Sequence, residues 1–394
     1  MKKIEMLPDK KFDCIVVGGG PGGSSFAFEA ASNGLKVLVL DKRQSIGEPV
    51  RCGEGVAIGT FKDNGIAEDP RYCINWVDGY KLFSPGGNSV TNPKDGGYVV
   101  DRFLFDKVLA LRAADAGATF VANAEATNVS RVKDGISVSV NLFGERSEVT
   151  APLVVGADGR ESRIAKMLGI RTELPVSSID KCFQYDMVFK VDEPQFLKIY
   201  LGREMAPKGY AWIFPKGPTR ANVGIGVSSL APLTAKEYLD RFIASHGIRG
   251  SPLQHVSGTI PLDPPKHDVY ADNFMLVGDA GRFVNPIHGG GIGDAMYSAK
   301  LAAQTAVAAF KKGDLSSNSL KGYAENFDEK MKSLRFLAKV KTVLTSMSDD
   351  DLDYIIKKVD GPFVQAAANG KSQANVLKLL LGRPSLLRFA AMLR

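Results

Sequence analysis

The first 40 residues alternate between apolar runs and a run with a helical pattern. Residues 12–17 and 35–40 are mostly apolar and predict two buried strands. Between them, residues 24–33 have a helical pattern that ends at Gly34, a residue type that commonly terminates helices. Strand, helix and strand in about 30 residues form a βαβ unit, in which the two strands are parallel. The pattern therefore predicts an α/β protein that begins with a parallel sheet.

The rest of the chain divides into segments with different patterns. Residues 181–227 alternate apolar and polar positions, which is typical of an antiparallel sheet with one packed face. Residues 42–100 are rich in Gly and Pro and are predicted to be irregular. Residues 318–394 predict helices with Lys and Arg on their polar faces. Further helices are predicted at 101–116, 233–246 and 294–310, and further strands at 119–124, 136–143, 147–155 and 272–278.

The composition is that of an ordinary globular protein, with 44% hydrophobic and 24% charged residues among 394. The net charge is +7, but the basic residues are scattered, so we expect no nucleic-acid partner. The cysteines Cys14, Cys52, Cys73 and Cys182 form no CxxC pair, which argues against a metal site. The chain shows no leader peptide and no apolar run of about 18 residues, which predicts a cytoplasmic protein.

Residues 377–394 mix Leu, Phe and Met with basic side chains, namely Lys378, Arg383, Arg388 and Arg394. A basic amphipathic helix of this kind can lie on an anionic lipid surface. It can equally cap the fold with its basic face in water. The first alternative predicts a peripheral membrane contact.

A glycine cluster follows the first predicted strand, and Gly18, Gly20 and Gly23 in it satisfy GxGxxG. Gly18 permits a tight turn, Gly20 lets the backbone approach a pyrophosphate, and Gly23 lets the helix pack on the strand. The pyrophosphate is expected on the free N–H groups at the helix N-terminus. Asp41 ends the next strand, where it can accept hydrogen bonds from ribose hydroxyls. The segment therefore predicts a site for the ADP half of a dinucleotide.

Two downstream features indicate which dinucleotide binds. Asp279 lies in a segment that resembles the second flavin motif of the hydroxylase-like FAD enzymes, where this Asp holds the ribityl chain. Its alternative role is that of a helix N-cap. The cluster 289–293 opens a helix whose N-terminus, with roughly half a positive charge, can stabilise a reduced anionic flavin. Residues 156–160, with Arg163, resemble the DG motif of the same superfamily. The predicted cofactor is FAD.

The combined pattern resembles the geranylgeranyl reductase family of FAD enzymes. Residues 48–55 match the family's PxRCxEG loop, and residues 210–215 with Gly224 and Gly226 match its YxWxFP…GxG element. The resemblance covers roughly residues 12–300. It implies that Arg102 reaches the flavin pyrophosphate and that the backbone of Ala126 meets the adenine. The implied flavin contacts are Gly22, Asp41, Cys52, Gly53, Gly55, Arg102, Ala126, Asp279, Gly291 and Ile292. Gly53 departs from the Ala of many members, which loosens the loop but keeps its backbone contacts.

The predicted fold is therefore α/β, with a Rossmann-type FAD-binding domain interleaved with an antiparallel-sheet substrate domain. The FAD-binding domain is expected at 1–180, with the irregular insert 42–100, and again at 266–310. The substrate domain is expected at 181–265. A C-terminal helical region is expected at 311–394.

The resemblance implies reduction of the C=C bonds of geranylgeranyl chains in archaeal membrane glycerophospholipids, with hydride from the reduced flavin. Tyr210, Trp212 and Phe214 alternate along a strand and so share one face, which can line a tunnel for a prenyl chain or simply pack in the core. Cys52 lies beside Arg51 in a polar loop, where it can gate the flavin, relay a proton or contribute only its backbone. We treat it as the candidate catalytic residue. His288 precedes the second glycine cluster and is a further candidate near the flavin.

Two other functions fit the first flavin motifs. One is an FAD-dependent aromatic monooxygenase, and the other is a flavin-binding carrier without turnover. The chain has no second dinucleotide fingerprint, so NAD(P)H would bind transiently or a ferredoxin would deliver the electrons. The predicted partners are thus a prenylated glycerophospholipid and one of these two electron donors.

Overall fold

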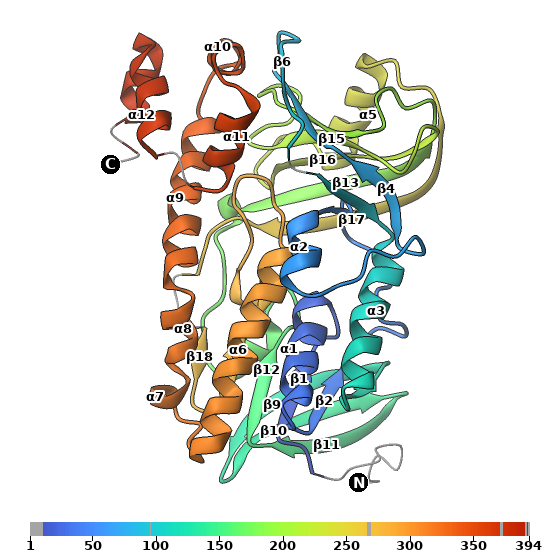
Figure 1. Ribbon diagram of the computed structural model, residues 1–394, viewed down its shortest axis with the longest axis vertical. Helices are drawn as coiled ribbons and strands as arrows, with labels where there is room; N and C mark the ends of the chain where they lie inside the picture. The colour runs from blue at the N-terminus through green and yellow to red at the C-terminus, as the bar shows by residue number, and fades with distance from the viewer. Residues whose placement is uncertain (1–10, 95, 266–268, 371–372, 391, 393–394) are drawn as a thin grey trace.

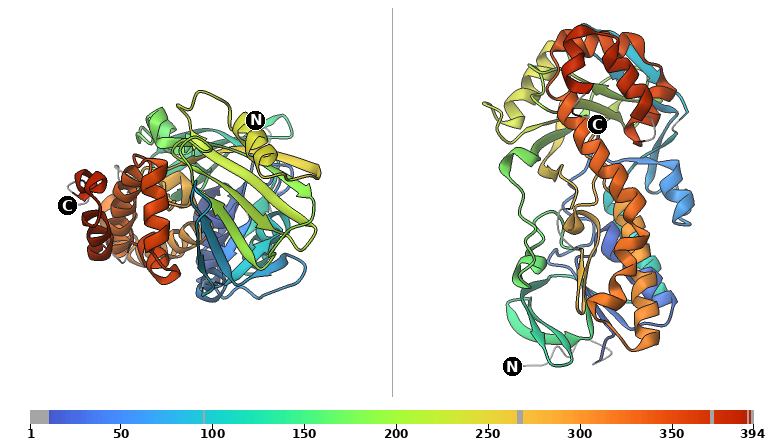
Figure 2. Two further views of the ribbon diagram at one scale, coloured as in Figure 1. Left: turned by 90° about the horizontal axis from the view of Figure 1, so that it is seen from above. Right: turned by 90° about the vertical axis from the view of Figure 1, so that its left-hand side faces the viewer.

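The computed structural model describes residues 11–94, 96–265, 269–370, 373–390 and 392. Two large sheets lie toward opposite ends of its long axis, a mostly parallel sheet in the lower half of Figure 1 and a mostly antiparallel sheet in the upper half. Helices with C-terminal residues lie along one side and gather beside the upper sheet (Figures 1 and 2). The α/β fold class predicted from the sequence is confirmed.

The lower sheet has the strand order β18-β19-β12-β1-β2-β8, and all of its pairs are parallel except β18 with β19. Its four central strands are buried throughout because helices and a second sheet cover them. The bounds are β1 Cys14–Val17, β2 Val37–Leu40, β8 Thr119–Val121, β12 Leu153–Gly156, β18 Tyr270–Ala271 and β19 Phe274–Leu276.

Three helices lie side by side against this sheet: α1 (Pro21–Ser32), α3 (Arg102–Asp115) and α6 (Ile292–Lys312) (Figure 1). Pro21 opens α1 at a position where its missing N–H costs nothing. The side chain of Asp101 caps α3 by accepting from the N–H of Leu104. α6 ends at Gly313, whose φ of 69° suits glycine. These three helices confirm the predicted helices near the first glycine cluster, at 101–116 and at 294–310.

The segment between α3 and β12 differs from the prediction in two places. The predicted strand 147–155 is in fact two strands, β11 (Glu145–Ala151) and β12, which Pro152 separates and which belong to different sheets. The predicted strand 119–124 ends at Val121, and β9 (Ala124–Val132) then begins a three-stranded antiparallel sheet with β10 (Gly135–Leu142) and β11. This sheet packs against the same core as the parallel sheet. Because the residues on both sides of each break are largely apolar, the sequence pattern did not reveal either break.

The upper sheet has the order β17-β13-β16-β15-β14-β5-β6. Its pairs are antiparallel except β14 with β5. The bounds are β5 Gly79–Phe83, β6 Ser89–Asn92, β13 Ile179–Val188, β14 Phe196–Tyr200, β15 Tyr210–Pro215, β16 Arg220–Ser228 and β17 Ser251–Pro261. The predicted antiparallel sheet at 181–227 is confirmed. Helix α5 (Ala235–Ser245), opened by a capping box at Thr234, covers one face of the sheet.

The prediction that residues 42–100 are irregular is wrong. Besides β5 and β6, this segment forms the antiparallel sheet β3 (Gly55–Ala57), β7 (Gly97–Val100) and β4 (Cys73–Val77), together with helix α2 (Ile58–Asp63). Its strands are short and separated by glycines, so they gave no clear period of two. The insert thus contributes two strands to the upper sheet, although the domain boundaries themselves stay a prediction.

The C-terminal region is helical, as predicted. Its elements are α7 (Ser317–Leu320), α8 (Gly322–Asn326), α9 (Asp328–Leu344), α10 (Asp349–Lys358), α11 (Gly361–Ala368), α12 (Gln373–Leu381), η3 (Pro384–Leu386) and α13 (Leu387–Ala390). The remaining short elements are α4 (Arg163–Met167), η1 (Val176–Ser178) and η2 (Gly278–Gly281). Among the described residues, no helix combines the length and the apolar character that crossing a bilayer requires.

The segment 377–394 is not one amphipathic helix, because Pro384 interrupts it between α12 and α13. The apolar side chains of Leu380, Leu386 and Phe389 pack into a cluster with α9 and α10. Arg383 binds the carboxylate of Asp351 at 3.2 Å. Arg394 lies outside the described residues. This packing fits the capping alternative, and the peripheral membrane contact stays a prediction.

Candidate cofactor and substrate site

The first glycine cluster has the geometry that its motif predicts. Gly18 has a φ of 108°, and a Cβ there would stand 2.2 Å from the carbonyl oxygen of Ala157. A Cβ at Gly23 would stand 1.8 Å from the carbonyl oxygen of Gly18, so only glycine lets α1 approach β1 this closely. A Cβ at Gly20 would meet nothing within 4 Å. The open side at Gly20, at the N-terminus of α1, is where a pyrophosphate can approach the backbone.

Asp41 stands at the end of β2 and accepts a hydrogen bond from the N–H of Gly19 at 2.7 Å. Its carboxylate also binds the guanidinium of Arg43 through both oxygens, at 2.9 and 2.6 Å. Burial opposes ionisation of Asp41, but Arg43 outweighs burial and lowers the pKa of the carboxyl. The carbonyl oxygen of Asp41 accepts from Ala124, which brings the start of β9, and with it Ala126, next to the motif.

Asp279 and Gly291, predicted from separate motifs, lie together. A Cβ on Gly291 would stand 3.0 Å from Oδ1 of Asp279. Burial raises the pKa of Asp279 to about 6, and the nearby positive charge of Arg102 opposes this rise. Gly291 is the N-cap of α6, and Ile292 is its first residue. Three residues assigned to the flavin, Arg102, Asp279 and Gly291, therefore surround one place at the N-terminus of α6.

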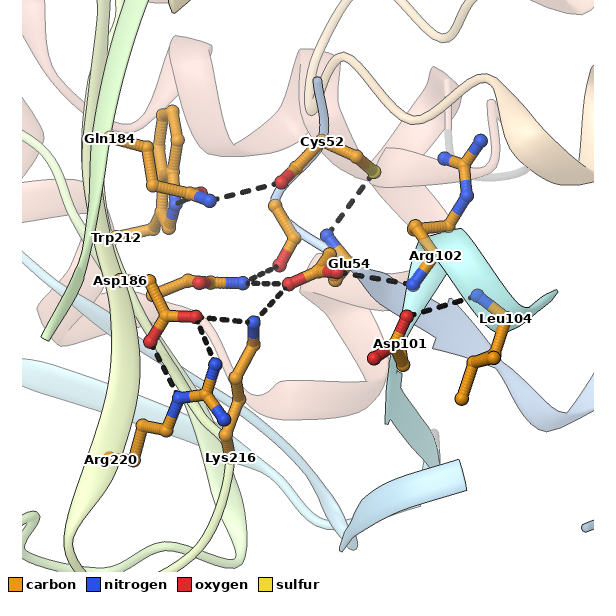
Figure 3. Close-up of polar contacts among 12 residues, drawn as sticks. Cys52, Glu54, Asp101, Arg102, Leu104, Gln184, Asp186, Trp212, Lys216 and Arg220 are labelled. Carbon is orange, nitrogen blue, oxygen red and sulfur yellow. Dashed lines mark hydrogen bonds and ion pairs between the residues drawn. The ribbon is translucent and has the colours of Figure 1, made fainter. Parts of the chain in front are cut away.

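Arg102 is held by Asp106 one helical turn further along α3. The guanidinium binds both carboxylate oxygens, at 2.9 and 3.0 Å. Burial disfavours the charge of Arg102, but Asp106 and Cys52 together raise the pKa of the guanidinium. The predicted loop cysteine and the predicted pyrophosphate-binding arginine are thus neighbours (Figure 3).

The loop 48–55, named here the Cys52 loop, is fixed through its backbone. The carbonyl oxygen of Cys52 accepts from the side-chain amide of Gln184 at 3.1 Å, and the same Gln184 accepts from the indole N–H of Trp212 at 2.9 Å (Figure 3). The thiol sulfur of Cys52 accepts from the N–H of Glu54 at 3.2 Å. Glu54 is 4% exposed, and its φ of 72° is a conformation rare outside glycine. A backbone conformation of this kind persists only where contacts with the surrounding structure enforce it.

A buried charge network supplies this support (Figure 3). The ammonium of Lys216 lies 2.5 Å from the carboxylate of Glu54 and 2.9 Å from that of Asp186, and all three side chains are about 6% exposed or less. Asn222 donates to Glu54 at 2.6 Å, and Arg220 binds both oxygens of Asp186. Burial opposes ionisation of Asp186, but Arg220 and Lys216 outweigh it and lower the pKa of this carboxyl. The Cys52 loop is therefore anchored to β13, β15 and β16.

Tyr210, Trp212 and Phe214, named here the aromatic row, lie on one face of β15, as the alternation predicted. Their ring centroids are 5.8 Å and 6.2 Å apart in sequence order. Trp212 lies over Gly224, where a Cβ would stand 2.3 Å from the indole ring. Phe214 lies against the Cys52 loop, 3.0 Å from where a Cβ on Gly53 would stand. The YxWxFP…GxG element and the PxRCxEG loop are thus two halves of one structure.

Two family models match the chain, the geranylgeranyl reductase catalytic domain at residues 178–260 and an NAD(P)-binding Rossmann-like domain at residues 16–54. Proteins named digeranylgeranylglycerophospholipid reductase from Methanocaldococcus jannaschii and Methanoculleus marisnigri are 37% and 36% identical to it. The matches cover 96% and 95% of this chain and 97% and 96% of the relatives. The chain belongs to the geranylgeranyl reductase family.

The solved structures agree with this assignment. A geranylgeranyl bacteriochlorophyll reductase-like protein from Thermoplasma acidophilum superposes with a TM-score of 0.89 at 33% identity, over 98% of this chain and 100% of that one. A flavin-dependent halogenase at 20% identity and a TM-score of 0.71, matched over 95% of this chain and 73% of that one, shares the fold. The matches favour a reductase of the geranylgeranyl reductase family over the monooxygenase and carrier alternatives.

The residues of this geranylgeranyl reductase family member fit FAD as the cofactor. The open glycine turn and Asp41 suit the ADP half, and Arg102 is a cation for the pyrophosphate. Asp279 is a suitable hydrogen-bond acceptor for the ribityl chain, and the N-terminus of α6 is suitable for the flavin ring. Gly22 lies in the first turn of α1 and Gly55 at the end of the Cys52 loop, and a Cβ at either would meet neighbours at 3.4 Å. The individual contacts remain predictions.

Two other predicted candidates also lie near the site. Asp158 of the DG motif accepts from the N–H of Ile164 at 3.1 Å, and burial raises the pKa of its carboxyl. His288 accepts the hydroxyl of Tyr210 at its carbonyl oxygen, 2.5 Å away, and burial lowers the pKa of its ring to about 4. A lowered pKa favours a neutral ring at neutral pH, but the side chain of His288 is exposed, so its contacts indicate neither a packing role nor a charge role.

The sequence missed the residues that hold the loop. Lys216 directly follows the YxWxFP element and Asn222 lies two residues before its GxG, so both were adjacent to recognised motifs. Gln184 and Asp186 alternate along β13 on the face of the sheet that meets the loop. A polar residue at every second position of a strand facing a core was the signal that could have found them.

Proposed function

We propose that the protein is an FAD-dependent reductase that saturates C=C bonds in the geranylgeranyl chains of membrane glycerophospholipids. The observation that carries the proposal is the junction of the aromatic row with the Cys52 loop, beside the N-terminus of α6. This junction places an apolar wall next to the predicted flavin site. The relatives at 36–37% identity are named for the same reaction.

The protein's part in such a reaction is to bind and orient. FAD supplies the hydride when bound in its reduced form. An isolated alkene has no polar handle, so position and exclusion of water depend on apolar walls. Tyr210 and Trp212 line a small cavity together with Ile260 and Ile287, and these apolar side chains offer contacts to a prenyl chain. We propose the aromatic row as its binding surface.

Cys52 is proposed to act at the flavin, as a gate or as a proton relay. Its sulfur faces Arg102 and is held by the N–H of Glu54. The charge network fixes the loop from the opposite side. This fixed backbone supports a role that needs a defined position.

Two further partners belong to the proposal. The NAD(P)-binding Rossmann match covers the same residues as the predicted ADP site of FAD, so it indicates no second nucleotide site. We therefore propose that NAD(P)H binds transiently or that a reduced ferredoxin donates electrons. A peripheral membrane contact is proposed at the C-terminal end, where Leu381 and Leu387 are 52% and 48% exposed near Arg388.

The proposed function is tested with photoreduced protein under argon. Adding a digeranylgeranyl glycerophospholipid should reoxidise the flavin, and mass spectrometry should show two added hydrogens for each double bond reduced. A saturated lipid of the same headgroup is the control and should leave the flavin reduced. A flavin that stays reduced with the unsaturated lipid, or product formed only with oxygen uptake, would contradict the reductase.

The proposed FAD contacts are tested by Asp41→Ala. Loss of a charged hydrogen-bond acceptor should weaken FAD binding about 10- to 100-fold. Asp69→Ala is the matched control, because Asp69 binds Arg71 in the same way at a surface position. Equal FAD content in both variants, measured by absorbance of the desalted proteins, would exclude Asp41 as a cofactor contact.

A further inference from the structure

The cavity beside the aromatic row contains an acid and an amine in otherwise largely apolar surroundings. Its walls include Tyr210, Trp212 and Ile260, together with Asp180 from β13 and Lys341 from α9. Figure 1 shows α9, a helix of the C-terminal region, with its upper end beside the upper sheet. Neither Asp180 nor Lys341 belongs to any motif recognised in the sequence.

The strand register explains why the cavity is open between the aromatic row and this acid. Tyr210 pairs with Gly226, Gly226 with Cys182, and Cys182 with Gly258, so the row across the sheet alternates large or polar residues with glycines. A Cβ on Gly258 would meet nothing within 4 Å. Asp180 lies two residues before Cys182 on β13, so its side chain points to the same face.

The acid and the amine are close, and both are shielded from water. Nζ of Lys341 lies 3.4 Å from Oδ2 of Asp180, and the two side chains are 15% and 10% exposed. Burial raises the pKa of Asp180, whereas Lys341 and the more distant Lys208 oppose the rise. A pair this long and this buried contributes little to stability, because desolvation offsets most of its attraction. A contribution to stability therefore does not explain why this pair lies in the cavity.

Saturating a double bond needs a proton as well as a hydride. Burial raises the pKa of Cys182 to about 12 and also raises that of Tyr210, whose hydroxyl is already donated to His288. Both groups are therefore poor acids near neutral pH. A buried carboxylic acid next to an ammonium is a better one, because the ammonium stabilises the carboxylate left behind.

We propose that Asp180, with Lys341 beside it, supplies the proton for the reduction, an inference that rests on the proposed function. One alkene carbon receives the hydride with two electrons from the reduced FAD, and its neighbour receives the proton. The π bond is replaced by two C–H bonds, one N–H bond of the reduced flavin and the O–H bond of Asp180 break, and the flavin is oxidised by two electrons. The carboxylate of Asp180 then pairs with the ammonium of Lys341 until a proton returns from water.

A different role for Lys341 is to bind the phosphate of the lipid headgroup. The ammonium of Lys341 already faces Asp180 at 3.4 Å, and the carboxylate left after the proton transfer would repel an anion there, so the structure favours the proton role. The two roles also predict different kinetic defects, in affinity for one and in the rate at saturating lipid for the other.

The test is Asp180→Asn, which keeps the size of the side chain but removes the acid. Reoxidation of the photoreduced flavin by saturating unsaturated lipid should slow by about 10²- to 10⁴-fold, whereas lipid affinity stays unchanged. Asp180→Glu should recover part of the rate. Asp240→Asn, in the exposed Lys236–Asp240 pair, is the matched control and should behave as the unmodified protein.

A second readout needs no turnover. In infrared spectra of the cofactor-free protein, a protonated carboxyl band should persist to higher pH than those of surface carboxyls, disappear in Asp180→Asn and persist to still higher pH in Lys341→Met. The charged or titratable groups near this carboxyl are Lys341 from α9, Lys208 before β15, Cys182 from β13 and Tyr210 from β15.

The outcomes separate the two proposals. If the unmodified protein reduces the lipid and Asp180→Asn does so at the same saturated rate, the proton role is overturned and the reductase stands. If Asp180→Asn keeps the saturated rate and Lys341→Met loses only lipid affinity, the headgroup role of Lys341 replaces the proton role. If the unmodified protein does not reduce the lipid, both proposals fall, whatever the infrared band shows.

Discussion

The two sheets build their halves of the site by different means. In the parallel-sheet region, the cofactor side is made largely from backbone, with glycines at Gly18, Gly20 and Gly23 and the N-termini of α1 and α6. In the antiparallel region, the facing side is made from side chains, with the aromatic row and the network around Lys216. The cofactor side depends on glycines, which have no side chain to block the backbone. The facing side depends on side chains that several strands bring together.

This difference predicts different responses to substitution. A change in the glycine cluster should abolish FAD binding rather than weaken it by degrees, and should also damage the fold where the new side chain meets backbone atoms, because these cannot move aside. A change in the network or the aromatic row should have graded effects, because the remaining partners can adjust. Three substitutions test this contrast.

The largest effect is expected for Gly23→Ala. Its methyl group would stand 1.8 Å from the carbonyl oxygen of Gly18, so α1 cannot keep its place on β1. We expect loss of FAD and a decrease in the free energy of unfolding of more than about 3 kcal/mol. Gly20→Ala is the control, because a methyl there meets nothing within 4 Å at a φ of −74°. It should fold normally and lose only FAD, so full FAD content in Gly20→Ala would break the contrast.

A smaller effect is expected for Lys216→Met in the network. The carboxylates of Glu54 and Asp186 lose a shared ammonium but keep Asn222 and Arg220, so the cost should be about 3 kcal/mol, at the low end for a broken buried pair. Chemical denaturation measures this cost. Lys81→Met removes the more exposed pair with Glu193 and should cost no more than about 1 kcal/mol. Equal losses of stability in Lys216→Met and Lys81→Met would show that burial of the network does not increase its contribution to stability.

The smallest effect is expected for Gly53→Ala in the Cys52 loop. The new methyl would stand 3.0 Å from the ring of Phe214, which must shift by a few tenths of an ångström. Overpacking of this size should cost about 1 kcal/mol and change the fluorescence of the adjacent Trp212. Gly258→Ala adds a methyl in open space on the same sheet and should change neither property. A Gly53→Ala protein that loses all FAD would contradict a graded response.

The sequence predicted the turns and helix starts of the backbone half, whereas their cofactor contacts stay predictions. GxGxxG, Asp41, Asp279 and the second glycine cluster each carry a local signature, because the turn that each forms depends on neighbours in the chain. The aromatic row was also predictable, since alternation along one strand puts its members on one face.

The side-chain half was less predictable. Gln184 reaches the backbone of Cys52, and Lys216 reaches Glu54, only because β13, the end of β15 and the Cys52 loop come together, and no spacing within the chain indicates these contacts. Asp180 and Lys341 are 161 residues apart and were not recognised at all. The strands between residues 42 and 100 were missed because they are short and separated by glycines, and one of them, β5, also pairs with the distant strand β14.

The pairing of β5 with β14 also bears on how the chain can assemble. Gly79 in β5 can pair only after Phe196 in β14 has been synthesised. The parallel sheet is complete only after β19 has paired with β12. Each sheet therefore closes only after much of the other has been synthesised, and pairings between such distant segments make folding slow. We expect that a chain stopped near residue 265 would expose an unfinished edge in the parallel sheet and need a chaperone, so neither sheet should be obtainable as an independent fragment.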